Sequence, residues 1–323
     1  MRIVTVTAPG GPENLIIAEA RRPDAGSGEV VVKVVAAGVN RADLLQRQGF
    51  YPPPPGASDV MGLEVAGTID SVGTGVTGWQ VGQECVALLA GGGYAEYVRV
   101  PADQVIAPPR GVDLVSAAGL VEVAATVVSN FDHVRLAAGE TVLVHGGTGG
   151  IGTFAIQYAK ALGARVLATA GSPEKLDVCR QLGADVALDY HDDWVAGVRD
   201  ATTGRGVDVI LDVIGAKYLE PNVASLAVDG RLVVIGMQGG RKGTLDLGQL
   251  LTKRATVTAT NLRGRPVEQK GAICAAVAER AWPLVESGQI RLATESRFPV
   301  DQVADAHRQL ESGRNIGKVI LTL

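Results

Sequence analysis

The chain has 323 residues, 46% of them hydrophobic, and its 30 basic and 34 acidic side chains give a formal net charge of −4. A single hydrophobic core stops growing beyond roughly 250–300 residues, so two domains are expected. The slightly acidic balance and the absence of basic-aromatic clusters exclude a general polyanion-binding surface and argue against a nucleic-acid partner.

The cysteines and the apolar segments of the chain indicate in which cellular compartment the protein is expected. Cys85, Cys179 and Cys274 are odd in number and far apart, which predicts no disulfide framework and favours a reducing compartment. Met1–Val6 is typical of a strand rather than of a signal peptide. No uncharged apolar run reaches the roughly 18–20 residues of a membrane span. We therefore expect a cytoplasmic protein without a membrane partner.

The first stretch of the chain, residues 1 to about 122, is rich in valine, glycine and turn signals. Its apolar segments include Val30–Val35, Val65–Val72 and Glu84–Leu89. Short β-forming runs separated by turn residues predict an irregular antiparallel or barrel-like β domain.

From about residue 123 to residue 262, strands and helices alternate. The predicted strands are Val142–His145, Arg165–Ala168, Val186–Asp189, Val207–Asp212, Leu232–Gly236 and Thr256–Thr260. This alternation predicts a parallel sheet with helices on both faces. After Pro266 come an Ala-rich helix, a polar strand, a helix over Val303–Leu310 and a terminal strand over Gly317–Leu323. Because the alternating stretch is central, we expect residues 1–122 and 263–323 to form one domain and residues 123–262 another.

The motif that indicates a cofactor is a glycine-rich turn between a short apolar strand and a helix. Its residues are Gly147, Thr148, Gly149, Gly150, Ile151 and Gly152. Glycines let backbone N–H groups approach phosphates without a Cβ in the way, and a helix N-terminus favours negative charge. With a strand before the turn and helical apolar spacing after it, these residues are expected to hold a dinucleotide pyrophosphate.

The next strand helps to choose between cofactors. An NAD site usually ends this strand with an acid that binds the ribose 2′-OH, but here Gly171 and Ser172 follow instead. Lys175 lies in the first helical turn, where the helix dipole favours an acid rather than a base. A lysine at this position is reasonable if its ammonium group faces a 2′-phosphate. The alternative is a solvated lysine whose charge Glu174 offsets. Tyr190, after the following strand, is a second candidate beside the adenosine ribose. NADPH is the predicted cofactor.

A second informative segment runs from Asn40 to Tyr51 and is followed by four prolines and Gly56. The prolines fix an extended backbone and restrict the residue before them. Tyr51 would then present a flat, amphipathic ring suited to stacking near a planar substrate or a nicotinamide. The alternative is a loop that only packs Phe50 and Tyr51 against the fold.

Four motifs carry a resemblance to a known family. They are Asn40–Tyr51 with its proline run, Gly62-Leu63-Glu64-x-x-Gly67, Gly91–Val98 and Asn315–Val319. With them the chain resembles the quinone oxidoreductase branch of the medium-chain dehydrogenase/reductase superfamily, nearly end to end. The resemblance implies a GroES-like catalytic domain from both chain ends, a Rossmann NADPH-binding domain between them, and an active site in the cleft between domains.

The resemblance also implies roles for single residues. Asn40 would contact the nicotinamide ribose and Tyr51 would line the quinone pocket, which makes them the expected catalytic residues. The glycine-rich turn would hold the phosphates, and Lys175 and Tyr190 would recognise the 2′-phosphate. The further cofactor-binding positions that it implies are Thr126, Gly171, Ser172, Gly236, Met237, Gln238, Arg263 and Asn315.

One departure from the wider superfamily concerns metal. Its zinc-dependent members place a cysteine and a Gly-His-Glu motif where this chain has Asn40-Arg41 and Gly62-Leu63-Glu64, and they carry a four-cysteine lobe that is absent here. The four histidines have no i, i+4 partner and no paired cysteines. No metal is expected; Glu64 should have a structural role behind the site, and His145 and His307 packing roles.

The expected reaction is direct hydride transfer from NADPH to a quinone, with a proton from solvent or a tyrosine hydroxyl. One alternative is a 2-alkenal or enone reductase on the same fold, differing in the pocket near Tyr51 and Met237. A more distant one is a non-enzymatic NADPH-binding protein. The apolar segments Leu232–Gly236 and Ala255–Thr260 could lie near a sheet edge, and in this family such edges pair between subunits, so a homodimer is expected.

Overall fold

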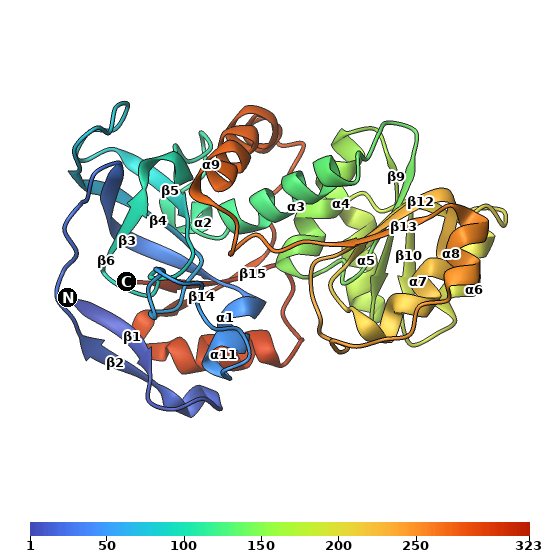
Figure 1. Cartoon of the computed structure of the whole chain (residues 1–323), viewed down its shortest axis with the longest axis horizontal. Coiled ribbons are helices and arrows are strands. Elements are labelled where there is room, and N and C mark those ends of the chain that lie inside the picture. The colour runs from blue at the N-terminus through green and yellow to red at the C-terminus, as the bar shows by residue number, and fades with distance from the viewer. The chain divides into compact units, whose positions relative to one another are not determined.

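The computed structural model describes all 323 residues, and the chain divides into two compact units. Unit 1 consists of Met1–Ala125, Leu262–Gly288 and Leu292–Leu323, and unit 2 of Thr126–Asn261 with Gln289–Arg291. The division falls inside one continuous helix, α3 (Val121–His133). Figure 1 shows the blue N-terminal and red C-terminal segments in the same unit.

Unit 1 is built on a seven-stranded sheet with the order β14-β15-β3-β4-β5-β7, in which β6 also pairs with β3. Its strands are β3 (Glu29–Val39), β4 (Glu64–Val72), β5 (Glu84–Leu88), β6 (Tyr97–Pro101), β7 (Val105–Ile106), β14 (Glu295–Pro299) and β15 (Lys318–Thr322). Only the β14–β15 pair is parallel. A separate antiparallel pair is formed by β1 (Arg2–Val6) and β2 (Leu15–Glu19). The antiparallel character predicted for the first stretch is therefore found.

The register between β15 and β3 positions a pair of polar residues. Val319 lies opposite Val39, so Lys318 at the start of β15 comes beside Asn40, which follows β3 directly. Asn40 begins helix α1 (Arg41–Arg47), where the Asp43 side chain accepts from the Asn40 backbone N–H at 2.8 Å. A carboxylate at this position satisfies one of the free N–H groups of the first turn.

The helices of unit 1 are short and lie around the sheet (Figure 1). Besides α1 they are η1 (Pro12–Asn14), η2 (Ala102–Gln104), α2 (Leu114–Ala117), α9 (Val267–Ala276), the π-helical η4 (Val277–Ala281), α10 (Trp282–Glu286), η5 (Val300–Gln302) and α11 (Val303–Glu311). The helix predicted over Val303–Leu310 is thus confirmed, one residue longer at its end.

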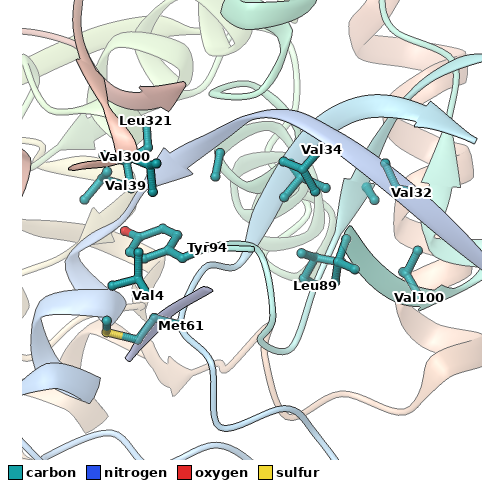
Figure 2. Packing of buried hydrophobic residues seen from close by; sticks show 14 of the residues in the cluster. Val4, Val32, Val34, Val39, Met61, Leu89, Tyr94, Val100, Val300 and Leu321 are labelled. Carbon is teal, nitrogen blue, oxygen red and sulfur yellow. The ribbon is translucent and has the colours of Figure 1, made fainter. Parts of the chain in front are cut away.

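The core of unit 1 is formed mainly by the inward-facing residues of β3 and its neighbours. Val30, Val32 and Val34 alternate along β3 toward this core, and Val31 and Ala36 on the other face of the strand are buried as well. Figure 2 shows Tyr94 among the apolar side chains beside Val4. Burying each such aliphatic side chain stabilises the fold by about 1.5–3 kcal/mol. The strands that carry the site residues are therefore stabilised by their packing against this core.

Unit 2 contains a six-stranded parallel sheet with the order β10-β9-β8-β11-β12-β13, which confirms the predicted doubly wound arrangement. The strands are β8 (Thr141–Val144), β9 (Arg165–Ala170), β10 (Val186–Asp189), β11 (Val207–Asp212), β12 (Leu226–Val234) and β13 (Thr256–Ala259). The order reverses between β8 and β11. Ligands of such sheets bind at the carboxyl ends of the strands beside this switch point.

Two predicted strands need correction, and the first is β9, which was expected over Arg165–Ala168 and continues to Ala170. The second, expected over Leu232–Gly236, is β12, which starts earlier and ends at Val234, two residues before Gly236. The reason is a close approach between loops, because a Cβ at Gly236 would lie 2.6 Å from the carbonyl oxygen of Val213. The chain leaves the sheet here and turns against the loop that follows β11.

Helices cover both faces of the unit 2 sheet (Figure 1). On one face lie α4 (Gly150–Ala161) and α5 (Pro173–Gln181), and on the other α6 (Trp194–Ala201), α7 (Leu219–Ser225) and α8 (Leu247–Lys253), with η3 (Ala216–Tyr218) before α7. None of the helices in the chain combines the length and the apolar character that crossing a membrane requires.

Candidate active site

The glycine-rich turn lies where β8 ends and α4 begins, at the switch point of the unit 2 sheet. A Cβ at Gly147 would lie 2.6 Å from the Cys179 sulfur, and one at Gly152 would lie 2.7 Å from the main chain of Gly147. Gly149 is the N-cap of α4 and offers no side-chain acceptor, so the first-turn N–H groups are available to an anion. The cradle therefore fits a dinucleotide pyrophosphate.

Sequence reasoning missed one glycine of this turn. Gly146 has a φ of +70°, a conformation that L side chains rarely adopt. The carbonyl oxygen of Gly146 accepts from the N–H of Gly149 at 3.1 Å and closes the turn. The signal was present in the doubled glycine after His145, but a sequence does not show which of two neighbouring glycines has positive φ.

Strand β9 supports the turn from behind. The hydroxyl of Thr169 accepts from the N–H of Gly146 at 3.3 Å, and its carbonyl oxygen accepts from the N–H of Gly147 at 2.9 Å. His145 is buried, with Nδ1 3.0 Å from the Thr169 hydroxyl and Nε2 2.7 Å from Oδ1 of Asn222. Burial lowers the pKa of His145 to about 4, so the ring is neutral at physiological pH. His145 thus packs beneath the turn, as expected.

The residues expected at the adenosine end gather around the start of α5. Ser172 is the N-cap, and its hydroxyl accepts from the N–H of Lys175 at 3.3 Å. The N–H of Tyr190 donates to the carbonyl oxygen of Ala170 at 3.0 Å. This places the Tyr190 ring over Gly171, where any Cβ would overlap the ring. The structure therefore brings Gly171, Ser172 and Tyr190 together at the end of β9, with Lys175 in the first turn of α5.

Two loops at the carboxyl ends of β11 and β12 are tied together. The N–H of Gln238 donates to Val213 at 3.4 Å and that of Gly239 to Ile214 at 2.7 Å. Asp212 holds the first loop by accepting from the N–H groups of Ile214 and Gly215 at 2.6 and 3.0 Å. Burial raises the pKa of Asp212 to about 6.

Met237 and Thr126 differ in their exposure. Met237, in the loop after β12, is 53% exposed. Thr126 is buried on α3, where its carbonyl oxygen accepts from the Asn130 amide at 2.7 Å. Of the two side chains, that of Met237 is the more accessible to a small molecule.

In unit 1, the partly buried Asn40 contacts two buried charged side chains. Its Oδ1 accepts from Nζ of Lys318 at 2.8 Å, and its Nδ2 donates to Oε1 of Glu64 at 2.9 Å. Lys318 and Glu64 form an ion pair at 2.7 Å with side-chain exposures of 8% and 0%. The other carboxylate oxygen of Glu64 accepts from the N–H of Glu122 at 2.9 Å. Both ends of the Asn40 amide are therefore held in one orientation.

Glu64 has the supporting role that was expected, but Lys318 was missed as a site residue. A signal existed, because Lys318 is a lone charge at the start of the apolar terminal strand. The set of one amide, one carboxylate and one ammonium group does not fit a zinc ion, since the ammonium already lies against the carboxylate. The structure contains no group of three or more His, Cys, Asp or Glu side chains that could hold a metal.

A second buried network anchors the start of α1. Asp43 accepts from the N–H of Gly62 and from the hydroxyl of Tyr94, both at 3.1 Å. Nε2 of His307 lies 3.3 Å from the same hydroxyl, and Nδ1 lies 3.5 Å from the guanidinium of Arg47. Burial raises the pKa of Asp43 to about 6 and lowers that of His307 to about 3. His307 therefore has a buried packing role in unit 1.

Tyr51 lies half-buried after α1, and its main-chain oxygen accepts from Arg263 at 3.2 Å. The Arg263 guanidinium carbon lies 5.1 Å from the centroid of the Tyr51 ring. Asn315 donates to the carbonyl oxygen of Gly317 in its own loop at 3.2 Å. The structure thus brings Arg263 to Tyr51, and contact of Arg263 or Asn315 with a cofactor stays a prediction.

Residues 26–110 match the alcohol dehydrogenase GroES-like domain family, and residues 150–276 match the zinc-binding dehydrogenase family. A quinone oxidoreductase of Pseudomonas aeruginosa is 33% identical over 322 residues, which cover 98% of each chain. The chain belongs to the quinone oxidoreductase branch of the medium-chain dehydrogenase/reductase superfamily. The predicted family and the predicted pairing of a GroES-like with a Rossmann domain are confirmed.

Other members of this superfamily are similar in structure or sequence. The structure of Escherichia coli quinone oxidoreductase complexed with NADPH matches with a TM-score of 0.91 and 29% identity, covering 100% of both chains. A 2-haloacrylate reductase from a Burkholderia species is 30% identical over 329 residues, covering 97% of this chain and 96% of the relative. The chain is therefore an NAD(P)-dependent reductase similar to quinone oxidoreductases.

Proposed function

We propose that this member of the branch is an NADPH-dependent quinone oxidoreductase that transfers hydride to a quinone without a metal. The observation that carries the proposal is the cluster at Asn40, where a lysine ammonium and a carboxylate hold an amide and leave no zinc ligand set. The acceptor must then be activated by hydrogen bonds or need little activation. A quinone needs little, because its reduction restores an aromatic ring.

Unit 2 supplies the proposed cofactor site. When bound, NADPH supplies the hydride from its nicotinamide ring. The N–H groups of the turn Gly147–Gly152 would bind the pyrophosphate at the start of α4. Lys175 and Tyr190 would recognise the 2′-phosphate. Strand β9 ends in Ala170 and lacks the acid that is typical of NAD sites.

Unit 1 supplies the proposed acceptor-side residues. The fixed amide of Asn40 would bind the nicotinamide ribose, and the Tyr51 ring would stack against the flat acceptor. The balance requires one hydride and one proton for each quinone converted to hydroquinone. The proton would come from solvent or from the Tyr51 hydroxyl. The contribution of the protein is then mainly positioning, which can supply several orders of magnitude in rate.

A second candidate is a 2-alkenal or enone reductase, in which hydride goes to an activated carbon–carbon double bond. It is favoured by the similarity to the 2-haloacrylate reductase. The two candidates would differ in how the half-buried Tyr51 receives the acceptor.

The test is steady-state oxidation of NADPH and of NADH with 1,2-naphthoquinone, 1,4-benzoquinone and an α,β-unsaturated ketone. We expect turnover of both quinones with NADPH, and a kcat/KM at least about tenfold lower with NADH, the effect of about one lost charge-assisted hydrogen bond. NADH used equally well or better would contradict the cofactor assignment. Turnover of the ketone alone would move the enzyme to the second candidate.

We also propose that the chain forms a homodimer through the β13 edge of the unit 2 sheet. β13 is the last strand of that sheet and has no partner on its outer side. On the adjoining α8, which contacts β12, Leu247 and Leu251 are 68% and 79% exposed. Pairing of two edges would satisfy the unpaired N–H and C=O groups and cover the leucines. Light scattering after gel filtration should give twice the chain mass, and a monomer would contradict it.

A further inference from the structure

Arg263 is a buried arginine without an acidic partner. It is 5% exposed, and no carboxylate lies within ion-pair distance of its guanidinium. Burying a charged group costs free energy unless its hydrogen bonds are satisfied. Here they are made to neutral acceptors, the carbonyl oxygens of Ala90 and Tyr51 and the side-chain oxygen of Gln46, at 2.7, 3.2 and 2.7 Å.

These acceptors belong to three separate parts of unit 1. Gln46 lies on α1, Tyr51 begins the proline-rich loop, and Ala90 precedes the glycines 91–93. The amide nitrogen of Gln46 also donates to the carbonyl oxygen of Asp59 at 2.9 Å. The loop from Tyr51 to Asp59 is therefore tied at its start by Arg263 and at its end by Gln46, which bind each other.

The guanidinium also contacts the Tyr51 side chain. Its carbon lies 5.1 Å from the ring centroid, within the roughly 6 Å of a cation–π contact. The main chain and the ring of Tyr51 are thus held by the same group. A planar fork with five donors can do both at once, whereas a lysine at this position would present only a flexible point charge.

We propose that Arg263 is a positioning residue that fixes the Tyr51 ring for the acceptor. The inference rests on the proposed function, because Tyr51 is itself the proposed stacking surface. Arg263 would act through Tyr51 and not on the reacting atoms. Its loss would remove the contacts of the guanidinium with the main chain and the ring of Tyr51. The acceptor would then bind less well while NADPH binding stayed the same.

The test compares Arg263→Gln, Arg263→Lys, Tyr51→Ala and the double variant Arg263→Gln/Tyr51→Ala. We expect both Arg263 variants to raise the KM for 1,4-benzoquinone about tenfold, with the KM for NADPH unchanged. Gln removes the charge-assisted contacts, whereas Lys keeps the charge but loses the planar fork that contacts the main chain and the ring of Tyr51 together. In the Tyr51→Ala background the Arg263→Gln change should add less than about threefold, because residues that act through one another are non-additive. Full additivity would overturn the proposal.

Two further variants serve as controls. Arg231 in unit 2 also donates hydrogen bonds to main-chain oxygens, those of Val134 and Arg135, at 2.9 and 3.0 Å. Arg231→Gln should lower Tm without a selective rise in the quinone KM. If Arg263→Gln does not fold, Gln46→Ala removes one acceptor and frees Asp59 while keeping the guanidinium, and it should raise the quinone KM alone.

The outcomes separate the inference from the function on which it rests. A quinone KM raised by Tyr51→Ala but unchanged by the Arg263 variants would overturn the role of Arg263 and leave the function standing. A quinone KM unchanged by Tyr51→Ala would overturn the acceptor role of Tyr51 and the inference with it. A rise in the NADPH KM in Arg263→Gln would assign Arg263 to the cofactor instead.

Discussion

At the scale of single residues, Lys175 tests the choice of cofactor. Because β9 ends in Ala170 and the N-cap of α5 is Ser172, Lys175 is the proposed cation for the 2′-phosphate. We expect Lys175→Ala to raise the KM for NADPH about tenfold or more, the effect of one lost charge-assisted hydrogen bond, and to leave the KM for NADH unchanged.

The matched control for this prediction is Lys160, on the neighbouring helix α4. It forms an ion pair with Asp185 at 3.0 Å and has no assigned role toward the cofactor. Steady-state kinetics of Lys160→Ala should match the wild type with both cofactors. An equal rise in the KM for NADPH and the KM for NADH in Lys175→Ala would show that the lysine does not bind the 2′-phosphate.

The buried Lys318–Glu64 pair gives a second prediction. Lys318→Met leaves a fully buried carboxylate without its cation, which should lower the free energy of unfolding by about 3–5 kcal/mol. Lys318→Met/Glu64→Gln leaves no charge and should regain more than half of that loss. Urea unfolding of the single and double variants measures both. A double variant less stable than Lys318→Met would contradict the expected order.

Sequence reasoning identified Asn40 and Glu64 but not the lysine that joins them. Asn40 and Glu64 lie in motifs that could be recognised locally. Lys318 reaches them only because β15 pairs with β3, and 278 positions of sequence separate Lys318 from Asn40. The contact between Arg263 and Tyr51 was not foreseen for the same reason, since it depends on a fold that brings distant segments together, and a cofactor contact of Arg263 stays a prediction.

At the scale of elements, the glycine-rich turn depends on close packing at Gly152. A Cβ there would overlap the carbonyl oxygen of Gly146 and lie 2.7 Å from the main chain of Gly147. Gly152→Ala should therefore lower the free energy of unfolding by about 1–3 kcal/mol, as overpacking does. At Gly149 the nearest atom would lie 3.6 Å from a Cβ and φ is −72°, so Gly149→Ala should unfold at nearly the wild-type temperature. Calorimetry that finds equal Tm values for the two variants would refute this.

The ends of helices and strands were predicted well where the local sequence pattern determines them, and less well where a contact with a distant loop determines them. The strand Val207–Asp212 agrees with β11 at both ends, because its apolar run is bounded by turn residues. The end of β12 at Val234 could not be seen, since it depends on the approach of Gly236 to the loop after β11. Nor does apolar patterning show α1, a helix of seven residues fixed by the Asp43 contact at its start.

At the scale of the whole molecule, the fold class followed from the alternation in the middle of the chain. That both chain ends build one unit followed from the same pattern, and the β15–β3 pairing shows how this happens. The strand order within unit 1 was not predictable, because antiparallel pairing between distant segments leaves no period in the sequence.

Two buried histidines should make the molecule sensitive to acid. Burial lowers the pKa of His145 from 6.5 to about 4 and that of His307 to about 3. As the pH falls below about 6.5, the two histidines take up protons in the unfolded chain before they do so in the folded chain. Their contribution to the free energy of unfolding is therefore fully present above pH 6.5 and is lost as the pH falls toward 4. Asp43 and Asp212, whose pKa values burial raises to about 6, act in the opposite direction over a smaller range.

A substitution isolates one of these contributions. The loss of stability caused by His145→Asn should be largest at neutral pH and should shrink as the pH falls toward 4. In this range protonation of His145 in the unfolded chain lowers the free energy of unfolding of the wild type, and the variant lacks this histidine. Urea unfolding at a series of pH values measures the difference. A difference that stays constant or grows toward acid would contradict the neutral, buried state of His145.

The most direct test of the proposed function is a competition experiment with the full chain. 1,4-Benzoquinone and an α,β-unsaturated ketone, at equal concentrations with NADPH in one solution, give the ratio of their kcat/KM values from the products formed. A sample of heat-denatured protein corrects for direct reduction of the quinone by NADPH. We expect hydroquinone to form about tenfold faster or more than the saturated ketone, because discrimination follows differential transition-state binding. Preferential formation of the saturated ketone would contradict a quinone reductase and identify an enone reductase on the same fold.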